Sequence, residues 1–278
     1  MDGCEFSLFD LLEKCALKVR EAVIPLMGKN LASKPVGRGA GGDLTKIIDL
    51  KAEQAIMNEL KEAGISCTII SEEAGIVRIG ASPDKFYVVT DPLDGTTNAT
   101  HGIPFAATSI AVATKPFFSH LTAAVVLDLV HNVLYKAERG KGAYRNDERI
   151  RSSQNDDVVN SVLGVDVNIY KALNGKLREK LGRILSITKH PRYFGANALE
   201  LCFVAAGVSD GFVDLRRKLR ALDIAGGYLI AREAGAIITT PDGKEIEAEI
   251  TPQTRIALVA AGNKKLHKKI LEILNREK

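Results

Sequence analysis

Short apolar runs with strand character alternate along this chain with longer segments in which apolar residues recur at helical spacing. The strand-like runs are residues 67–70, 86–90, 109–113, 122–127, 133–137, 162–167, 211–215, 236–240 and 256–260. The helical segments are residues 6–27, 49–63, 173–185, 196–206, 224–234 and 264–278. Because strands and helices of this kind interleave from one end to the other, the sequence predicts a mixed α/β fold.

One polar and charged stretch is the best candidate for a joint between two parts of the chain. Residues 151–157 read Arg-Ser-Ser-Gln-Asn-Asp-Asp between apolar segments. The 278 residues suffice for one large domain or two closely joined halves. We predict an N-terminal half over residues 1–151 and a C-terminal half over residues 152–278.

Composition excludes several classes of protein. The net charge is only +4, aromatic residues make up 5% and Trp is absent, whereas nucleic-acid binding needs a larger basic field with aromatics that stack on bases. The four Cys include no CxxC pair, which argues against a zinc or redox site. Acidic residues interrupt the N-terminal region, and no apolar run reaches the ~20 residues of a membrane helix. We therefore expect a cytoplasmic protein without nucleic-acid or membrane partners.

Two short motifs match known patterns in the wrong context. Residues 37–42 match GxGxxG within a segment, residues 34–43, that holds four glycines; a helical segment and Lys34-Pro35 precede it where a dinucleotide fold needs a strand. We predict a mobile loop there. Residues 207–211 match GxSxG but follow a helix and lead into a strand, the reverse of a nucleophile elbow. A helix-ending turn explains that match more simply.

A buried strand that ends in acidic residues carries the chemistry. Residues 86–90 run into Asp91-Pro-Leu-Asp94-Gly-Thr96. Two carboxylates this close repel each other unless a cation lies between them, and oxygen ligands suit a hard ion such as Mg2+. Gly95 leaves backbone N–H groups accessible for phosphate, and Thr96 adds a hydroxyl. A capped turn without a metal remains the alternative for this segment alone.

Two other segments supply further acids. Glu72 and Glu73 follow the strand-like run 67–70, where a solvated loop is the alternative. Asp223 directly precedes the apolar helical segment 224–234, where an ordinary helix N-cap is the alternative. A cap and a metal ligand are compatible roles.

Together these segments resemble the inositol monophosphatase family. Residues 91–96 are similar to its DPxDGT signature, and residues 222–227 with 233–236 to its WDxAAG and EAGG segments, although Leu222 replaces the usual Trp. Ser71-Glu72-Glu73 resembles the glutamate motif of the family, and residues 45–49 its upstream aspartate motif. Within the family the chain looks most like archaeal enzymes that act on both fructose 1,6-bisphosphate and inositol monophosphate.

The resemblance implies roles at the matching positions. Glu72, Asp91 and the Leu93 carbonyl would bind one Mg2+; Asp91, Asp94 and Asp223 would bind a second; Glu72 would share a third, so that two or three ions are expected, with Mn2+ as an alternative. Thr96, oriented by Asp49, would position the attacking water beside Glu72, and the Gly95 and Thr96 N–H groups would hold phosphate oxygens. Gly195, Ala196 and Asn197 match a segment that lines the alcohol pocket.

The basic residues before Asp223 bear on the substrate. Arg216 stands where inositol-specific relatives carry a glutamate, and Arg220 lies nearest to Asp223 on the chain. A guanidinium there can bind the second phosphate of a bisphosphate; a solvated basic turn is the alternative. Among the arginines of this segment we favour Arg220.

The resemblance thus implies a layered α-β-α-β-α sandwich, a homodimer, and a phosphatase acting on fructose 1,6-bisphosphate or inositol 1-phosphate by direct attack of metal-activated water. A nucleotide 3′-phosphatase, an NADP phosphatase and a non-catalytic metal- or phosphate-binding regulator remain the alternatives.

Overall fold

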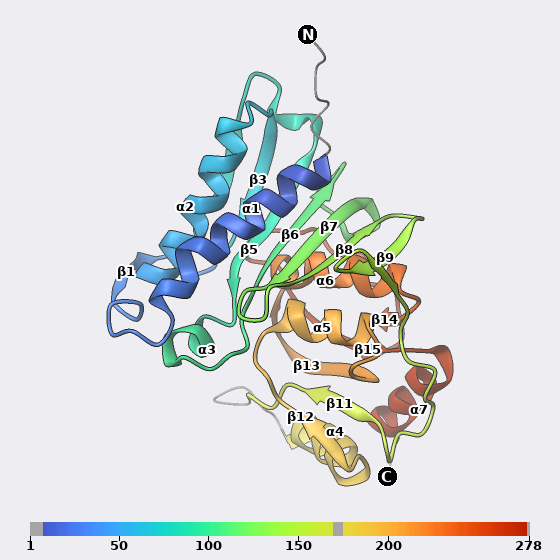
Figure 1. Cartoon of the computed structure of the whole chain (residues 1–278). Coiled ribbons are helices and arrows are strands. Elements are labelled where there is room, and N and C mark those ends of the chain that lie inside the picture. Colours follow the sequence, from blue (N-terminus) through green and yellow to red (C-terminus); the bar gives the residue numbers. More distant parts are fainter. Residues whose placement is uncertain (1–7, 169–174, 277–278) are drawn as a thin grey trace.

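The computed structural model describes residues 8–168 and 175–276. It is a stack of five layers, helices alternating with two sheets (Figure 1), which confirms the predicted α-β-α-β-α sandwich. The helices are α1 (Leu8–Val23), α2 (Ile47–Glu62), α3 (Thr96–His101), α4 (Gly175–Ile187), α5 (Asn197–Ala205), α6 (Ala221–Glu233) and α7 (Lys264–Asn275). No helix among these residues is both long and apolar enough to cross a bilayer.

The first large sheet has eight strands in the order β10-β9-β8-β7-β6-β5-β3-β4. Only the β3–β5 pair is parallel, and it places Ser71 opposite Thr90. The carboxyl ends of both strands therefore lie on the same side of the sheet. The strands are β3 (Cys67–Ser71), β4 (Gly75–Ile79), β5 (Tyr87–Asp94), β6 (Ala107–Ala113), β7 (Leu121–Asp128), β8 (Val133–Glu138), β9 (Gly142–Arg145) and β10 (Glu148–Ile150).

The second large sheet has five strands in the order β12-β11-β13-β15-β14. Its strands are β11 (Val162–Val165), β12 (His190–Arg192), β13 (Gly211–Arg220), β14 (Ile237–Thr239) and β15 (Arg255–Ala261). Pairing of β13 with β15 is interrupted between Asp214 and Leu219. The chain bulges there, and Arg217 takes a φ of 55°, in the left-handed region.

Three apolar layers hold the stack together. One lies between α1, α2 and the outer face of the first sheet, one around α5 and α6 between the two sheets, and one between the second sheet and α4 and α7. The middle layer contains buried side chains from both predicted halves, such as Val89 and Ala260. The two sheets fall on either side of residue 151, but the division at 151/152 stays a prediction.

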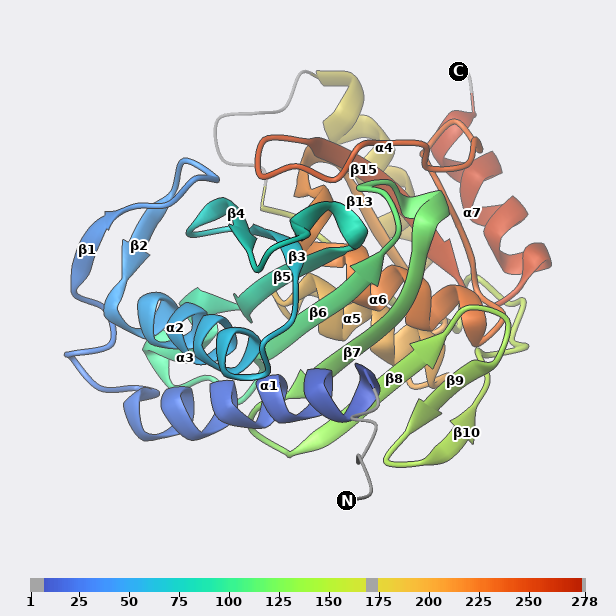
Figure 2. The same cartoon turned by 90° about the horizontal axis from the view of Figure 1, so that it is seen from above.

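The structure corrects several sequence predictions. The glycine-rich segment 34–43 contains strand β1 (Pro35–Arg38), which pairs with β2 (Leu44–Lys46) to form a hairpin beside α2 (Figure 2). Strand β5 extends through Asp94 instead of ending at residue 90, because it keeps pairing with β6 past Asp91. Strands β4, β9, β10 and β12 were not expected. The predicted helix 173–185 begins outside the described residues, and α4 starts at Gly175.

Candidate active site

Three carboxylates meet beside the carboxyl ends of β3 and β5. Glu72 follows β3, Asp91 lies near the end of β5, and Asp223 lies in the first turn of α6. Each offers an oxygen within 4.8 Å of those of the other two. Since Arg220 is the N-cap residue of α6, Asp223 does not cap that helix, and the N-cap alternative was wrong.

Burial makes this cluster electrostatically demanding. It raises the pKa of Glu72 and of Asp91, and the negative charge of the neighbouring carboxylates raises both pKa values further. Burial also raises the pKa of Asp223 to about 6, although the positive charge of nearby Arg220 opposes that rise. Arg220 Nη1 lies 2.6 Å from Glu72 Oε1 and 3.6 Å from Asp223 Oδ1. One cation thus faces three acids.

Asp94 has a different environment from these three. Its Oδ1 accepts the N–H of Asn197 at 2.8 Å, and its Oδ2 accepts those of Ala198 at 2.8 Å and Leu199 at 3.3 Å. Asp94 therefore satisfies the free N–H groups at the start of α5. Burial, followed by the charge of Asp223, raises its pKa to about 7 despite these bonds. The predicted ligand lies outside the cluster of three.

Thr96 and Asp49 form a hydrogen-bonded pair beside the cluster. The Thr96 hydroxyl donates to Asp49 Oδ1 at 2.8 Å, and its oxygen lies 3.1 Å from the Leu93 carbonyl oxygen, so one proton is shared between two acceptors. Asp49 is buried, and its Oδ2 accepts the Lys46 N–H at 2.8 Å. The pair that the sequence predicted is therefore present, and the lone pairs of Thr96 remain able to accept a hydrogen bond from water.

The start of α3 is packed too closely for any side chain at position 95. Gly95 has a φ of 87°, and a Cβ there would lie 3.0 Å from the Phe105 carbonyl oxygen and 3.1 Å from the Ala196 Cβ. The Gly95 and Thr96 N–H groups lie at this helix start, where the first N–H groups have no partner within the helix.

These residues line one open cleft of about 870 Å3. It brings together every residue predicted for the site except Ala196, which is fully buried behind the wall. The predicted members that line it are Asp49, Glu72, Asp91, Leu93, Asp94, Gly95, Thr96, Gly195, Asn197, Arg216, Arg220 and Asp223. Unpredicted members include Lys46, Asp166, Tyr193 and Arg255. Asp166 directly follows a strand, as Glu72 does, and this signal was overlooked.

The basic segment before Asp223 is mostly paired within the protein. Arg216 Nη2 forms ion pairs with Asp166 and, at 2.6 Å, with Asp214 Oδ2, and only 8% of its side chain is exposed. Arg220 pairs with Asp43 as well as with Glu72. The alternative of a solvated basic turn is therefore wrong for these two arginines.

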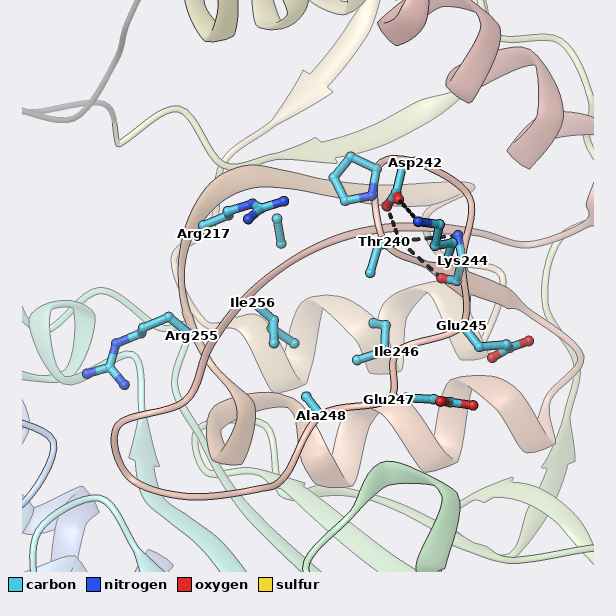
Figure 3. Close-up of a pocket in the computed structure, with 12 residues that line it drawn as sticks. Arg217, Thr240, Asp242, Lys244, Glu245, Ile246, Glu247, Ala248, Arg255 and Ile256 are labelled. Carbon is cyan, nitrogen blue, oxygen red and sulfur yellow. Dashed lines mark hydrogen bonds and ion pairs between the residues drawn. The ribbon is translucent and has the colours of Figure 1, made fainter.

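Arg217 faces a different groove, shown in Figure 3, which residues of β15 help to line and which contains none of the clustered carboxylates. The groove is lined by three basic side chains, Arg217, Lys244 and Arg255, and three acidic ones, Asp242, Glu245 and Glu247. Lys244 is paired with Asp242 at 3.1 Å. Because its charges balance and no acids converge there, this groove is not the candidate active site.

The hairpin turn, residues 39–43, lies against the carboxylate cluster. The Gly41 N–H donates to the Glu72 carbonyl oxygen at 3.0 Å, and Arg255 Nη2 donates to the Gly41 carbonyl oxygen at 2.9 Å. A Cβ at Gly41 would lie 3.0 Å from Arg220 Nε. The turn thus reaches both the cluster and the second sheet; the mobility predicted for it stays a prediction.

The carboxylate cluster fits a hard divalent cation. Its donors are all oxygens, and Asp223 Oδ1 is buried with no hydrogen-bond partner in the described part of the chain. Buried charges of one sign are costly unless they are paired or bind metal. Glu72, Asp91 and Asp223 are therefore the residues that would hold such an ion.

The comparisons with known proteins agree with this geometry. The family model described as the inositol monophosphatase family matches residues 8–278. A fructose-1,6-bisphosphatase/inositol-1-monophosphatase of Methanothermobacter thermautotrophicus is 38% identical over 94% of each chain. A protein of the same name from Thermococcus kodakarensis is 33% identical over 98% of this chain and 99% of its own.

Other similar proteins widen the range of activities. A bifunctional NADP phosphatase/NAD kinase of Methanococcus maripaludis is 33% identical over 95% of this chain but only 49% of its own length. A solved structure of an inositol monophosphatase-fructose 1,6 bisphosphatase superposes with a TM-score of 0.84 at 31% identity, covering 96% of this chain and 100% of the other. The chain therefore belongs to the inositol monophosphatase family, whose members are metal-dependent phosphoric monoester hydrolases.

Proposed function

We propose that this protein is a Mg2+-dependent phosphomonoesterase that hydrolyses fructose 1,6-bisphosphate, inositol 1-phosphate or both, by direct in-line attack of water. The observation that carries the proposal is the cluster of Glu72, Asp91 and Asp223 beside the Thr96–Asp49 pair, at one end of a single cleft. The relatives that bear both activity names support it.

The metal ligands we propose are Glu72, Asp91, the Leu93 carbonyl, Asp94 and Asp223, holding two or three Mg2+, with Mn2+ as an alternative ion. Bound Mg2+ lowers the pKa of its water and stabilises charge on phosphate oxygens. Asp94 would serve through the one acceptor site left on Oδ1, since each carboxylate oxygen has two sites and its bonds to α5 occupy one on Oδ1 and both on Oδ2.

The protein's own groups position the reactants. Asp49 accepts a hydrogen bond from the Thr96 hydroxyl, so the Thr96 oxygen would present its lone pairs to the attacking water and hold it in line with the ester bond. Glu72, adjacent on the cluster, would accept a hydrogen bond from the same water. The N–H groups of Gly95 and Thr96 would hold phosphate oxygens.

The alcohol part would occupy the other end of the cleft, lined by Gly195 and Asn197 with Ala196 behind them. A second phosphate would bind Arg220, which lines the cleft. Arg220 is paired with Glu72, and a bound cation would compete with the guanidinium for that carboxylate. Arg216 would contribute less, because Asp166 and Asp214 already enclose it.

An NADP phosphatase is the second candidate, because a relative with that activity in its name is as similar to this chain as several named bisphosphatases. We also propose a homodimer in the cytoplasm; the free buried thiols in the described part of the chain, Cys15, Cys67 and Cys202, suit a reducing compartment.

A substrate panel tests the proposal. Phosphate release would be measured with fructose 1,6-bisphosphate, inositol 1-phosphate, NADP and 3′-phosphoadenosine 5′-phosphate, each with Mg2+ and with EDTA. We expect Mg2+-dependent turnover of one or both of the first two at the highest kcat/KM. Preference for NADP would support the second candidate, and no Mg2+-dependent turnover would support a non-catalytic regulator. Gel filtration at micromolar concentration would test the dimer, which a monomer mass would contradict.

A further inference from the structure

The wall at the alcohol end of the cleft, residues 193–197, is held in place by side chains from other elements. Asn98 Nδ2 donates to the Phe194 carbonyl oxygen at 2.7 Å. The Gly195 N–H donates to Glu200 Oε1 at 3.1 Å. The Asn197 N–H donates to Asp94 Oδ1 at 2.8 Å. Three nearby backbone groups of the wall are thus fixed from three different side chains.

Of these three anchors, Glu200 stands behind the wall. It lies in the first turn of α5 and is only 3% exposed. Asp94 and Asn98 line the cleft, whereas Glu200 does not. Its carboxyl group therefore touches the wall from the protein side and has no direct access to a substrate.

The surroundings of Glu200 leave space for its carboxyl group, although burying that group costs free energy. Its Oε2 is buried and has no hydrogen-bond partner among residues 8–168 and 175–276. A Cβ at Gly164, on β11, would lie 2.6 Å from that oxygen, so the glycine leaves the space it occupies. Burial raises the pKa of Glu200 to about 8. Since an apolar side chain of similar size would be less costly in such a place, stability alone does not account for this acid.

The hydrogen bond that Glu200 accepts fixes the backbone of the wall at Gly195. Gly195 has a φ of 79°, in the left-handed region that glycine adopts freely. Its conformation is therefore set by its contacts, and the bond to Glu200 is the one that orients its N–H. Two and three positions further on, Asn197 and Ala198 donate their N–H groups to Asp94. Since those bonds hold the start of α5 at Asp94, a shift at Gly195 would displace the alcohol pocket and leave Asp94 in place.

We propose that Glu200 is a positioning residue that shapes the alcohol-binding wall and so determines how tightly the alcohol part of a phosphate ester is held. This inference rests on the proposed phosphatase function. It requires only the acceptor oxygen of the side chain and no negative charge. The amide of Gln keeps that oxygen, and Ala removes it.

The test compares Glu200→Gln, Glu200→Ala and a matched control, Glu59→Ala. Glu59 is also a buried glutamate, but it lies on α2, its Oε2 pairs with Lys14 at 2.6 Å, and it does not line the cleft. Two substrates are used: inositol 1-phosphate or fructose 1,6-bisphosphate, whichever the wild type hydrolyses faster, and p-nitrophenyl phosphate, whose alcohol part carries no ring hydroxyls.

For the polyol substrate we expect Glu200→Ala to raise KM by about 5- to 10-fold, the effect of one lost hydrogen bond, with a smaller change in kcat. Its hydrolysis of p-nitrophenyl phosphate should stay within about twofold of wild type, and Glu200→Gln should resemble wild type on both substrates. Hydrogen exchange over residues 193–197 should quicken in Glu200→Ala and not in Glu59→Ala.

Equal losses on both substrates, or a Glu200→Gln variant as impaired as Glu200→Ala, would overturn the positioning role. Unchanged exchange over residues 193–197 in Glu200→Ala would also overturn it. If the wild type hydrolyses p-nitrophenyl phosphate with Mg2+, the phosphatase proposal survives such a failure. If it hydrolyses neither substrate, the proposed function fails and this inference fails with it.

Discussion

At the metal end of the cleft, the carboxylates of Glu72, Asp91 and Asp223 lie within 4.8 Å of one another with Arg220 as their neighbouring cation. At the alcohol end, Arg216 is enclosed by Asp166 and Asp214, and hydrogen bonds fix the backbone of residues 193–197. The first arrangement sets three converging carboxylates against one arginine, whereas in the second Arg216 pairs directly with both neighbouring carboxylates. A site with excess converging carboxylates is suited to receive a cation, and a site whose charged groups are directly paired offers a fixed shape.

The difference predicts how mutations at each end behave. Removing a charge from the metal end should weaken metal binding and relieve repulsion in the metal-free protein, so that activity and stability change in opposite directions. Removing a contact from the alcohol end should reduce substrate binding and leave metal binding unchanged. The predictions below test this contrast.

The largest effect is expected for Asp91→Asn. The amide can keep the 3.1 Å bond that Asp91 Oδ1 accepts from the Leu93 N–H, but the charge at the centre of the cluster is lost. We expect kcat/KM to fall by about 10³-fold or more, several kcal/mol of transition-state stabilisation. Urea unfolding in EDTA should show a variant at least as stable as wild type. Near-normal activity at saturating Mg2+ would remove Asp91 from the site.

Arg220→Ala separates the substrate classes. If this guanidinium binds a second phosphate, kcat/KM for fructose 1,6-bisphosphate should fall. The fall should correspond to a loss of about 1.5–3 kcal/mol of transition-state stabilisation, the effect of one charged hydrogen bond. Inositol 1-phosphate has no second phosphate, so its kcat/KM should change much less. Removing the cation should also raise the Mg2+ affinity of the cluster. Equal losses on both substrates would limit Arg220 to a general electrostatic role.

Asp94→Asn should show the opposite stability change from Asp91→Asn. Its two oxygens accept three N–H groups from the start of α5, and an amide nitrogen in place of one oxygen cannot accept. We expect a loss of about 1–3 kcal/mol in the free energy of unfolding in EDTA. A variant as stable as wild type would mean that α5 does not depend on this carboxylate.

The smallest effect is a pH dependence of the metal-free protein. The folded pKa values of Asp223 and Asp94 are raised to about 6 and about 7, above those of an unfolded chain. The folded state then binds more protons than the unfolded state over this window, so stability falls as pH rises from about 4 to about 7. Thermal unfolding in EDTA should give a lower Tm at pH 7.5 than at pH 5. Saturating Mg2+, which requires the ionised carboxylates, should reduce or reverse that difference.

The sequence was most informative at the metal end, because its signals there are local. An apolar run followed by Asp-Pro predicts a strand that ends in an acid, and β3 and β5 deliver Glu72 and Asp91 in that way. The apolar helix after Asp223 was likewise predicted from its own composition. The order of the layers needed the family resemblance, since periodicity gives the class of elements but not their packing.

The sequence was least informative where distant segments decide the structure. Asp94 meets α5 about a hundred positions further along the chain, and no local pattern indicates that contact. The bulge that directs Arg216 toward Asp166 and Arg217 into another groove depends on how β13 pairs with β15. The glycine-rich segment looked like a loop, yet β2 supplies a pairing partner and makes it a hairpin.

The most direct test of the contrast between the two ends is calorimetric titration of Mg2+ into three proteins: wild type, Asp91→Asn and Tyr193→Ala. Tyr193 lines the alcohol end and is 49% exposed, so its truncation leaves the core intact. We predict that wild type and Tyr193→Ala bind Mg2+ with equal affinity, and that Asp91→Asn binds it at least about tenfold more weakly, the loss of one charged ligand. Absence of Mg2+ binding to wild type, or equal binding to all three proteins, would contradict the assignment of the metal end.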